Sequence, residues 1–218
     1  MDRPAVLEEI LEHSRSLGFL GPGQIDSHVL HARGLAQVAE AHFDRFGAGI
    51  PELVIDLGTG GGVPGLVWAW MWPSTRFLLL DANHRRTAFL DETVAALGWT
   101  ERVRVLCERA EVAGRDSAIR QSADMVVARS FGRPAVTAEC AAPLVKVDGL
   151  LVVAEPPPSQ SDSNGSVPRW PAAAVAELGL VPLTPVIEPV SAQVLVQRSA
   201  CPDRYPRRTG VPARRPLF

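Results

Sequence analysis

The sequence predicts an α/β fold built on a mostly parallel β-sheet with helices on both faces. Five short apolar runs alternate with helix-like segments through the middle of the chain, as in parallel sheets covered on both faces. A glycine-dense turn at residues 56–65, Asp-Leu-Gly-Thr-Gly-Gly-Gly-Val-Pro-Gly, joins the first strand to a helix. Such a turn lets a ligand lie against bare backbone at the positive end of a helix dipole. The 218 residues, 46% of them hydrophobic, suffice for one domain with a substantial core.

Two helices are predicted ahead of the sheet. Residues 4–17 carry apolar side chains at helical spacing with glutamates between them. Three glycines and a proline in residues 18–23 then predict a break. A second helix is expected over residues 25–46, with Asp26 or Ser27 as its cap. Residues 1–50 are therefore predicted to form an N-terminal helical extension.

The sheet follows in regular order. Strands are predicted at residues 53–56, 76–81, 103–107, 125–128 and 150–154, and helices at residues 64–71, 84–97, 110–120 and 133–144. The segment 156–169 is rich in proline and serine and poor in apolar residues, which predicts a mobile loop. A short helix at residues 171–178 and strands at 180–187 and 192–197 complete the prediction, the two strands forming an antiparallel edge.

The glycine turn allows more than one interpretation. A Gly-x-Gly-x-x-Gly pattern begins at Gly60, and Asp81 lies about 20 residues further on, as in dinucleotide-binding folds. Alternatively the first glycine is Gly58, directly after a strand that Asp56 closes. This arrangement resembles motif I of the S-adenosylmethionine-dependent methyltransferases, whose cofactor carries an ammonium and a sulfonium that favour a nearby carboxylate. We favour this second interpretation over a dinucleotide site and over a purely structural turn.

Further stretches carry a more specific resemblance. They are Asp56 to Gly65, Leu79-Leu80-Asp81, Arg85-Arg86, Phe89-Leu90, Arg109-Ala110-Glu111, Ala128 to Phe131 and Tyr205 to Pro212. In order and spacing the chain resembles the bacterial 16S rRNA guanine-N7 methyltransferases, also called glucose-inhibited division protein B. The resemblance implies the Rossmann-like fold of class I methyltransferases, with S-adenosylmethionine as cofactor and 16S rRNA or the small ribosomal subunit as partner.

The chain departs from the family in several places, among them a missing Asn-Leu-Thr element upstream and a short N-terminal region. The usual Arg-His-x-x-Asp-Ser stretch before motif I keeps only His28 within residues 27–32. After the fifth strand, Glu155-Pro156 stands where the family tends to have Lys-Gly. These departures leave two alternatives open, a catalytically altered cofactor-binding module on RNA or ribosomes and a methyltransferase for a small molecule.

The resemblance also assigns site residues. Gly58, Gly60 and Gly62 would allow close backbone approach, with Val63 beside the cofactor; Asp81 would accept the ribose hydroxyls. Ala110 and Glu111 would lie at the adenine. The cofactor-binding set implied is Asp56, Gly58, Gly60, Gly62, Val63, Asp81, Ala110, Glu111 and Arg129.

Arg129 is also the candidate catalytic residue. It ends the fourth strand, at the carboxyl edge where ligands bind such sheets, and could hold a cofactor carboxylate or an RNA phosphate. A structural salt bridge is the alternative. Phe131 could stack on a flipped-out base or belong to the core. Because guanine N7 has a free lone pair, its methylation needs no prior proton removal, and alignment can supply most of the catalysis.

The charge is distributed unevenly. Residues 198–218 hold six arginines and one acid, a net +5, so the rest of the chain carries −7 within a total of −2. A basic tail on an acidic body predicts a polyanionic partner. The proposed RNA-binding residues are Arg204, Arg207, Arg208, Arg214 and Arg215. Alternatively the tail is merely solvated, or Tyr205 and Leu217 pin it onto the body.

The remaining composition sets further expectations. We expect no membrane span, because no stretch reaches about 20 apolar residues, and no signal peptide. Cys107, Cys140 and Cys201 form no metal-like pattern, so we expect no metal and reduced thiols in a cytoplasm, with Cys107 in the core. The predicted organisation is a monomer with a methyltransferase domain at 51–200 and a basic C-terminal tail at 201–218.

Overall fold

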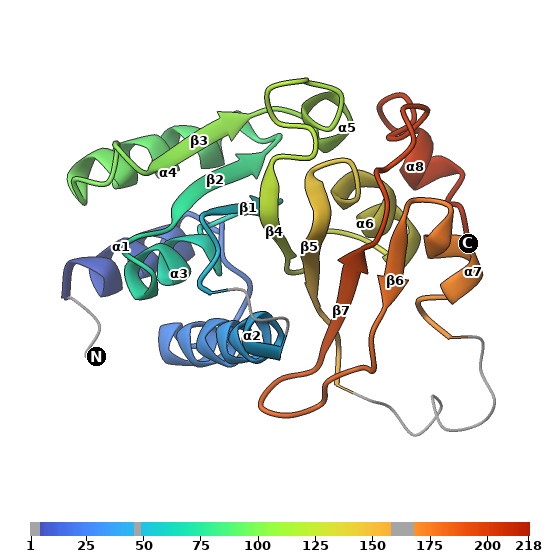
Figure 1. Ribbon diagram of the computed structural model, residues 1–218. Coiled ribbons are helices and arrows are strands. Elements are labelled where there is room, and N and C mark those ends of the chain that lie inside the picture. The colour runs from blue at the N-terminus through green and yellow to red at the C-terminus, as the bar shows by residue number, and fades with distance from the viewer. Residues whose placement is uncertain (1–4, 46–48, 158–167) are drawn as a thin grey trace.

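The computed structural model describes residues 5–45, 49–157 and 168–218 (Figure 1). Within them, seven strands form one sheet in the order β3-β2-β1-β4-β5-β7-β6. Their bounds are β1 Leu53–Leu57, β2 Arg76–Asp81, β3 Val103–Cys107, β4 Ala123–Ala128, β5 Val145–Ala154, β6 Leu180–Pro182 and β7 Ala192–Gln197. Strands β1 to β5 are parallel, and β7 is antiparallel to both β5 and β6. The predicted mobile loop lies for the most part outside the described residues.

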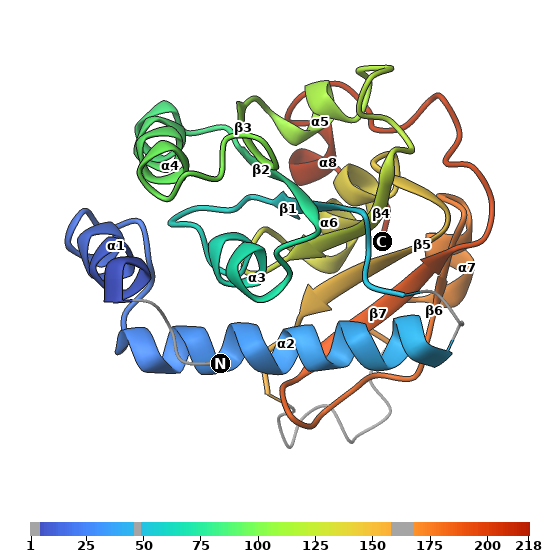
Figure 2. The same cartoon turned by 60° about the vertical axis from the view of Figure 1, so that its left-hand side comes forward.

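Helices cover both faces of the sheet, as predicted. Their bounds are α1 Ala5–Ser16, α2 Ile25–Arg45, α3 Gly65–Met71, α4 His84–Ala96, α5 Ala110–Ala113, α6 Pro134–Ala141, α7 Ala172–Ala176 and α8 Val211–Arg214. Successive strand residues face opposite cores: Val54 belongs to the cluster with α1 to α4, and Ile55 to the cluster with α5 to α7. Figure 2 shows α2 running along the first of these faces. None of the helices in the described part of the chain could span a membrane.

The N-terminal helices are bonded to the segment that follows β1. Ser14 Oγ of α1 donates to Gly61 O at 3.0 Å. Trp68 Nε1 of α3 donates to Ala32 O of α2 at 2.8 Å, and both residues are fully buried. Residues 5–45 therefore share the core of the sheet and fix the glycine turn from one side.

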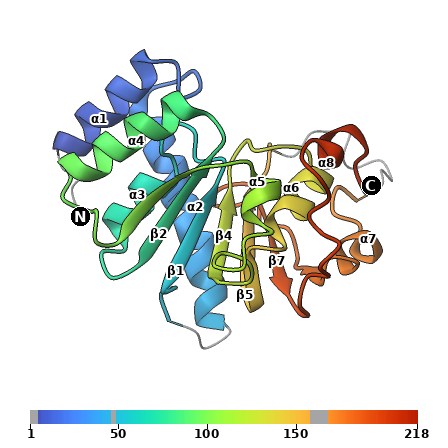
Figure 3. The same cartoon turned by 90° about the horizontal axis from the view of Figure 1, so that it is seen from above.

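The C-terminal segment is also folded onto the body (Figure 3). Tyr205 and Cys201 are buried in the core on the α5–α7 side, and Leu217 packs against it. The guanidinium of Arg120 donates to Cys201 O at 2.7 Å, Tyr205 O at 2.9 Å and Gly114 O at 2.9 Å. Of the alternatives for the tail, pinning by Tyr205 and Leu217 matches this packing.

Some of the sequence predictions need correction. The helix predicted at residues 110–120 ends at Ala113, because Gly114 packs against Pro206 of the tail and the chain turns there. The strand predicted at 180–187 ends at Pro182, with a single bridge from Val186 to Ala192 beyond it. Cys107 is exposed and not in the core, because it ends β3, the edge strand.

Candidate cofactor and substrate site

The glycine turn follows β1 in the chain and is hydrogen-bonded to the end of the neighbouring strand β2. Gly58 N and Thr59 N donate to Leu80 O at 2.8 and 3.0 Å, which holds the turn against β2. Gly58 has a φ of +72°, and a Cβ there would lie 2.5 Å from Cδ2 of Phe131. A side chain is excluded at Gly58 both by the backbone conformation and by the ring that covers it.

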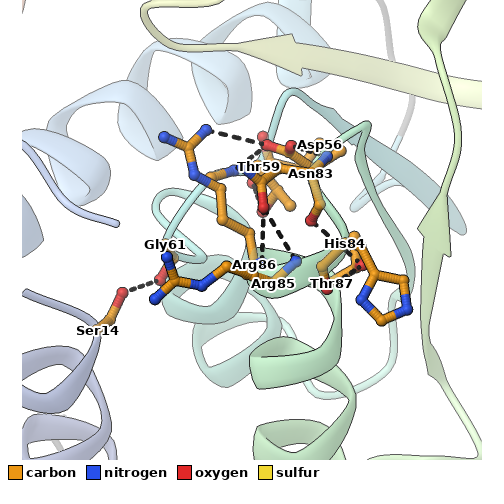
Figure 4. A network of polar contacts seen from close by, with 11 residues as sticks. Ser14, Asp56, Thr59, Gly61, Asn83, His84, Arg85, Arg86 and Thr87 are labelled. Atoms are coloured by element: carbon orange, nitrogen blue, oxygen red, sulfur yellow. Dashed lines mark hydrogen bonds and ion pairs between the residues drawn. The ribbon is translucent and has the colours of Figure 1, made fainter. Parts of the chain in front are cut away.

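Asp56 lies buried beneath this turn and organises it (Figure 4). Its Oδ2 accepts hydrogen bonds from Thr59 Oγ1 at 2.7 Å and from Gly65 N, the first residue of α3, at 2.8 Å. Its Oδ1 is buried without a hydrogen-bond partner among the described residues. Burial raises the pKa of Asp56 to about 6, although these two hydrogen bonds and the charge of Arg129 act in the opposite direction.

Asp81 lies at the end of β2 and faces the same turn. Its Oδ2 accepts from Gly60 N at 2.9 Å, and its Oδ1 accepts from Asn83 N at 2.8 Å. Arg86 Nη1 lies 3.7 Å from Oδ2. Asn83, which the sequence pattern does not single out, caps α4 by accepting from the backbone N–H groups of Arg85 and Arg86. The carboxylate of Asp81 is therefore positioned by the backbone and is not the helix cap.

Two adjoining cavities lie at the carboxyl ends of the strands. The first, of about 560 Å³, is lined among others by Gly58, Gly60, Val63 and Arg129. The second, of about 230 Å³, is lined by Gly58 together with Asp81, Ala110 and Glu111. Gly58, Arg86, Ser130 and Phe131 belong to both linings. The cavities therefore meet over the glycine turn, at the switch point between β1 and β4 where ligands bind in open α/β sheets.

Two of the predicted cofactor residues line neither cavity. Asp56 acts from below through the backbone of the turn. A Cβ on Gly62 would lie 2.5 Å from Leu66 Cδ1 and 3.0 Å from Leu90 Cδ2. Gly62 thus serves close packing of the turn on α3 and α4.

Arg129 lies at the end of β4 and reaches toward α2. It is partly buried, and its Nη1 lies 3.4 Å from Nδ1 of His28. Because a guanidinium only donates, His28 Nδ1 is the acceptor, and the proton on Nε2 is donated to Gly21 O at 3.1 Å. The pKa of His28 and that of His31 are lowered, mainly by burial and to a smaller extent by the charge of Arg129. Both shifts favour the neutral ring. Among the described residues Arg129 makes no ion pair within 4 Å, so the structural salt bridge considered for it is not formed there.

Glu155 forms another part of the first cavity wall. It follows β5, where the sequence departs from the family. Its Oε2 pairs with Arg169 Nε at 2.5 Å, and its Oε1 accepts from Trp170 Nε1 at 3.0 Å. The sequence pattern marked this position as unusual, but its two partners could not be deduced because they are 14 and 15 residues away across the loop.

The five arginines predicted to bind RNA differ in their surroundings. Arg204, Arg208, Arg214 and Arg215 are exposed. Arg207 instead pairs with the fully buried Glu139, with Nε to Oε1 at 2.8 Å and Nη2 to Oε2 at 2.6 Å. The guanidinium of Arg207 is thus engaged inside the protein. In the described ranges, no group of three or more histidine, cysteine or carboxylate side chains is placed to hold a metal ion.

Comparison with known proteins agrees with this geometry. The family model GidB, described as rRNA small subunit methyltransferase G, matches residues 25–160. A Synechococcus sp. (strain RCC307) protein named "Ribosomal RNA small subunit methyltransferase G" is 36% identical over 176 residues, 78% of this chain and 72% of that protein.

Two solved structures share the fold. A methyltransferase from Geobacter sulfurreducens superposes with a TM-score of 0.57 at 14% identity, covering 91% of each chain. The Podospora anserina methyltransferase PaMTH1, described as SAH-bound, gives a TM-score of 0.58 at 12% identity, covering 89% of this chain and 88% of that one. The class I methyltransferase fold is confirmed, and with the family match S-adenosylmethionine is confirmed as the cofactor. The chain belongs to the rRNA small subunit methyltransferase G family.

Proposed function

We propose that this protein transfers the methyl group of S-adenosylmethionine to N7 of a guanine in 16S rRNA. The observation that carries the proposal is the pair of adjoining cavities. The smaller one is lined by the carboxylates of Asp81 and Glu111, and the larger one by the cation of Arg129. The smaller cavity has hydrogen-bond acceptors for the hydroxyl and amine groups of a nucleoside. The larger cavity has a hydrogen-bond donor for an anionic or acceptor-rich group.

The residues of the smaller cavity fit the adenosyl part of the cofactor. Asp81 presents a carboxylate that backbone N–H groups already orient, as ribose hydroxyls require. Glu111 supplies an acceptor for the exocyclic amine of adenine, and Ala110 contributes an apolar wall. Under the turn, the charge of Asp56 favours a cationic ligand nearby, acting through space because Asp56 lines neither cavity. When bound, the cofactor supplies an electrophilic methyl group on a sulfonium.

The larger cavity can orient the acceptor base. Guanine N7 attacks through its own lone pair, so no side chain has to remove a proton, and positioning dominates. Arg129, held by His28, can donate to a phosphate, to a cofactor carboxylate or to the O6 acceptor beside N7. Phe131 covers Gly58 and lines both cavities, so its ring is available to stack on the base and to exclude water.

The proposal includes the way RNA reaches this site. Arg204, Arg208, Arg214 and Arg215 are exposed and can neutralise phosphates, whereas Arg207 is left out because Glu139 already pairs with it. We propose 16S rRNA or the small ribosomal subunit as partner, action as a monomer, and a cytoplasmic location. The free cysteines of the described structure are compatible with a reducing compartment.

The decisive measurement is a map of 7-methylguanosine in 16S rRNA from cells with and without the gene. The mark should disappear with the gene and return with the wild-type copy, but not with the Arg129→Ala variant. Arg133→Ala serves as the matched control, since Arg133 is exposed and lines neither cavity. An unchanged map combined with cofactor binding would favour an altered module or a small-molecule methyltransferase. Full methylation by Arg129→Ala would remove Arg129 from the catalytic site.

A further inference from the structure

The C-terminal segment touches the cofactor side of the site at one carboxylate. Gly210 N donates to Oε1 of Glu111 at 2.8 Å, across 99 residues of sequence. Glu111 is buried and lines the smaller cavity, and Gly210 caps the start of α8 in a left-handed conformation, with a φ of +77°. With Oε1 engaged in this way, Oε2 is the oxygen of Glu111 that has no hydrogen bond to the protein among the described residues.

The donor in this contact is itself held firmly. Arg207, three residues before Gly210, pairs with the fully buried Glu139 of α6 through Nε and Nη2 of its guanidinium and through its own backbone N at 2.8 Å. Arg207 Nη2 also donates to Arg215 O at 2.7 Å, directly after α8. Since breaking a buried ion pair leaves a charge uncompensated, this clamp fixes α8 on α6.

A second anchor holds α5, the helix that carries Glu111. Pro206 of the tail packs on Gly114 immediately after α5, so closely that a Cβ on Gly114 would lie only 3.1 Å from Pro206 Cγ. Arg120 bonds both Gly114 O and Tyr205 O. Residues 201–215 thus constrain α5 at its C-terminal end and at the carboxylate of Glu111.

We propose that residues 201–215 are a positioning element of the cofactor site, which aims Oε2 of Glu111 at the exocyclic amine of adenine. The inference rests on the proposed function for the identity of the cofactor. It gives the segment a role beyond contact with RNA phosphates. Loss of its contact with Glu111 should weaken cofactor binding in the absence of any RNA.

The first test uses Glu111→Gln in the full chain, titrated with S-adenosylhomocysteine and with its inosine analogue, in which a carbonyl replaces the amine. The glutamine oxygen can still accept from Gly210 N, while its NH₂ group then faces the purine. The wild-type chain should prefer the adenosine form by about tenfold, equivalent to about 1.4 kcal/mol, a single hydrogen bond to a charged group. The variant should lose or reverse that preference, which a merely structural role of Glu111 would not change.

The second test addresses the tail itself. A chain that ends at residue 209 lacks the N–H of Gly210 but keeps the Arg207–Glu139 pair, and a chain that ends at residue 215 is the matched control. The shorter chain should bind S-adenosylhomocysteine about tenfold more weakly and discriminate less, while the control should match the full chain.

The outcomes separate the two proposals. A full-length wild-type chain that binds no S-adenosylhomocysteine would overturn the proposed function. If it does bind, unchanged affinity and purine preference in Glu111→Gln would overturn the inference. Equal binding by the chains ending at 209 and 215 would overturn it as well. Should the shorter chain fail to fold, an unchanged purine preference in Glu111→Gln would still overturn the inference, because Glu111 would then not contact the purine.

Discussion

Replacing Asp56 by asparagine should make the protein more stable and a poorer cofactor binder. The carboxylate is fully buried, and its pKa rises from 3.8 to about 6, mainly because burial penalises the charge. The shift of about two pKa units means that the folded state destabilises the charged form of Asp56, relative to the neutral form, by about 3 kcal/mol. Asparagine can keep its oxygen on Thr59 Oγ1 and Gly65 N, so the hydrogen bonds of the turn need not be lost.

The sign of the pH dependence follows from linkage. Between pH 3.8 and about 6 the folded protein binds a proton at Asp56 more tightly than the unfolded chain does. The contribution of this group to stability is therefore highest at low pH and declines as the pH rises through that interval. Asp56→Asn removes the titration, so its advantage over wild type should be small near pH 4 and reach about 1 to 3 kcal/mol at pH 8.

The assay is urea denaturation of both proteins at several pH values, since titrations elsewhere cancel in the difference between variant and wild type. Asp91→Asn on the exposed side of α4 is the matched control, because it removes an exposed carboxylate by the same substitution. Calorimetric titration of S-adenosylmethionine should show weaker binding by Asp56→Asn. A variant that is less stable than wild type at pH 8 would refute the argument, because the hydrogen bonds of the charged form would then outweigh its burial.

Two further predictions concern contacts described above. Asp81→Asn should weaken S-adenosylhomocysteine binding by about 1 to 3 kcal/mol in a folded protein, with Asp91→Asn as control; unchanged affinity would remove Asp81 from the site. Arg120→Met should lower the free energy of unfolding by about 2 to 4 kcal/mol, because three buried or half-buried carbonyls lose a charged donor. Arg115→Met removes only an exposed bond of 3.5 Å to Arg204 O and should lower the free energy of unfolding far less when both variants are compared by urea denaturation. Equal losses would contradict the anchoring role of Arg120.

The parts of the fold that depend on local pattern could be predicted from the sequence. The strands β1, β2 and β4 are mostly apolar because helices cover both faces, and that pattern is visible without any partner. The helix predicted at 110–120 was wrong because its end depends on Gly114 meeting Pro206, a contact across 92 residues. Local periodicity carries no information about such a contact.

In the candidate site, too, the features set by local sequence could be predicted and those set by long-range contacts could not. Asp56, Gly58 and Asp81 could be proposed from spacing, since the turn and the strand end lie close in sequence and determine one another. The charge pattern does not distinguish the tail arginines from one another. Arg207 differs from the others because it pairs with the buried carboxylate of Glu139, 68 residues away in the sequence. The orienting contact of His28 with Arg129 spans 101 residues and could likewise be found only in the structure.

Both ends of the described chain therefore take part in the site. On one side Ser14 bonds the glycine turn and His28 bonds Arg129; on the other, Gly210 bonds Glu111. Each of these contacts joins a segment outside the central sheet to a group at its carboxyl edge, where the parallel strands alone leave side chains exposed to solvent. A sheet of this topology supplies the turn and the strand ends. The orientation of the charged groups around them depends on the terminal segments, so changes in those segments should alter ligand binding even when the sheet remains intact.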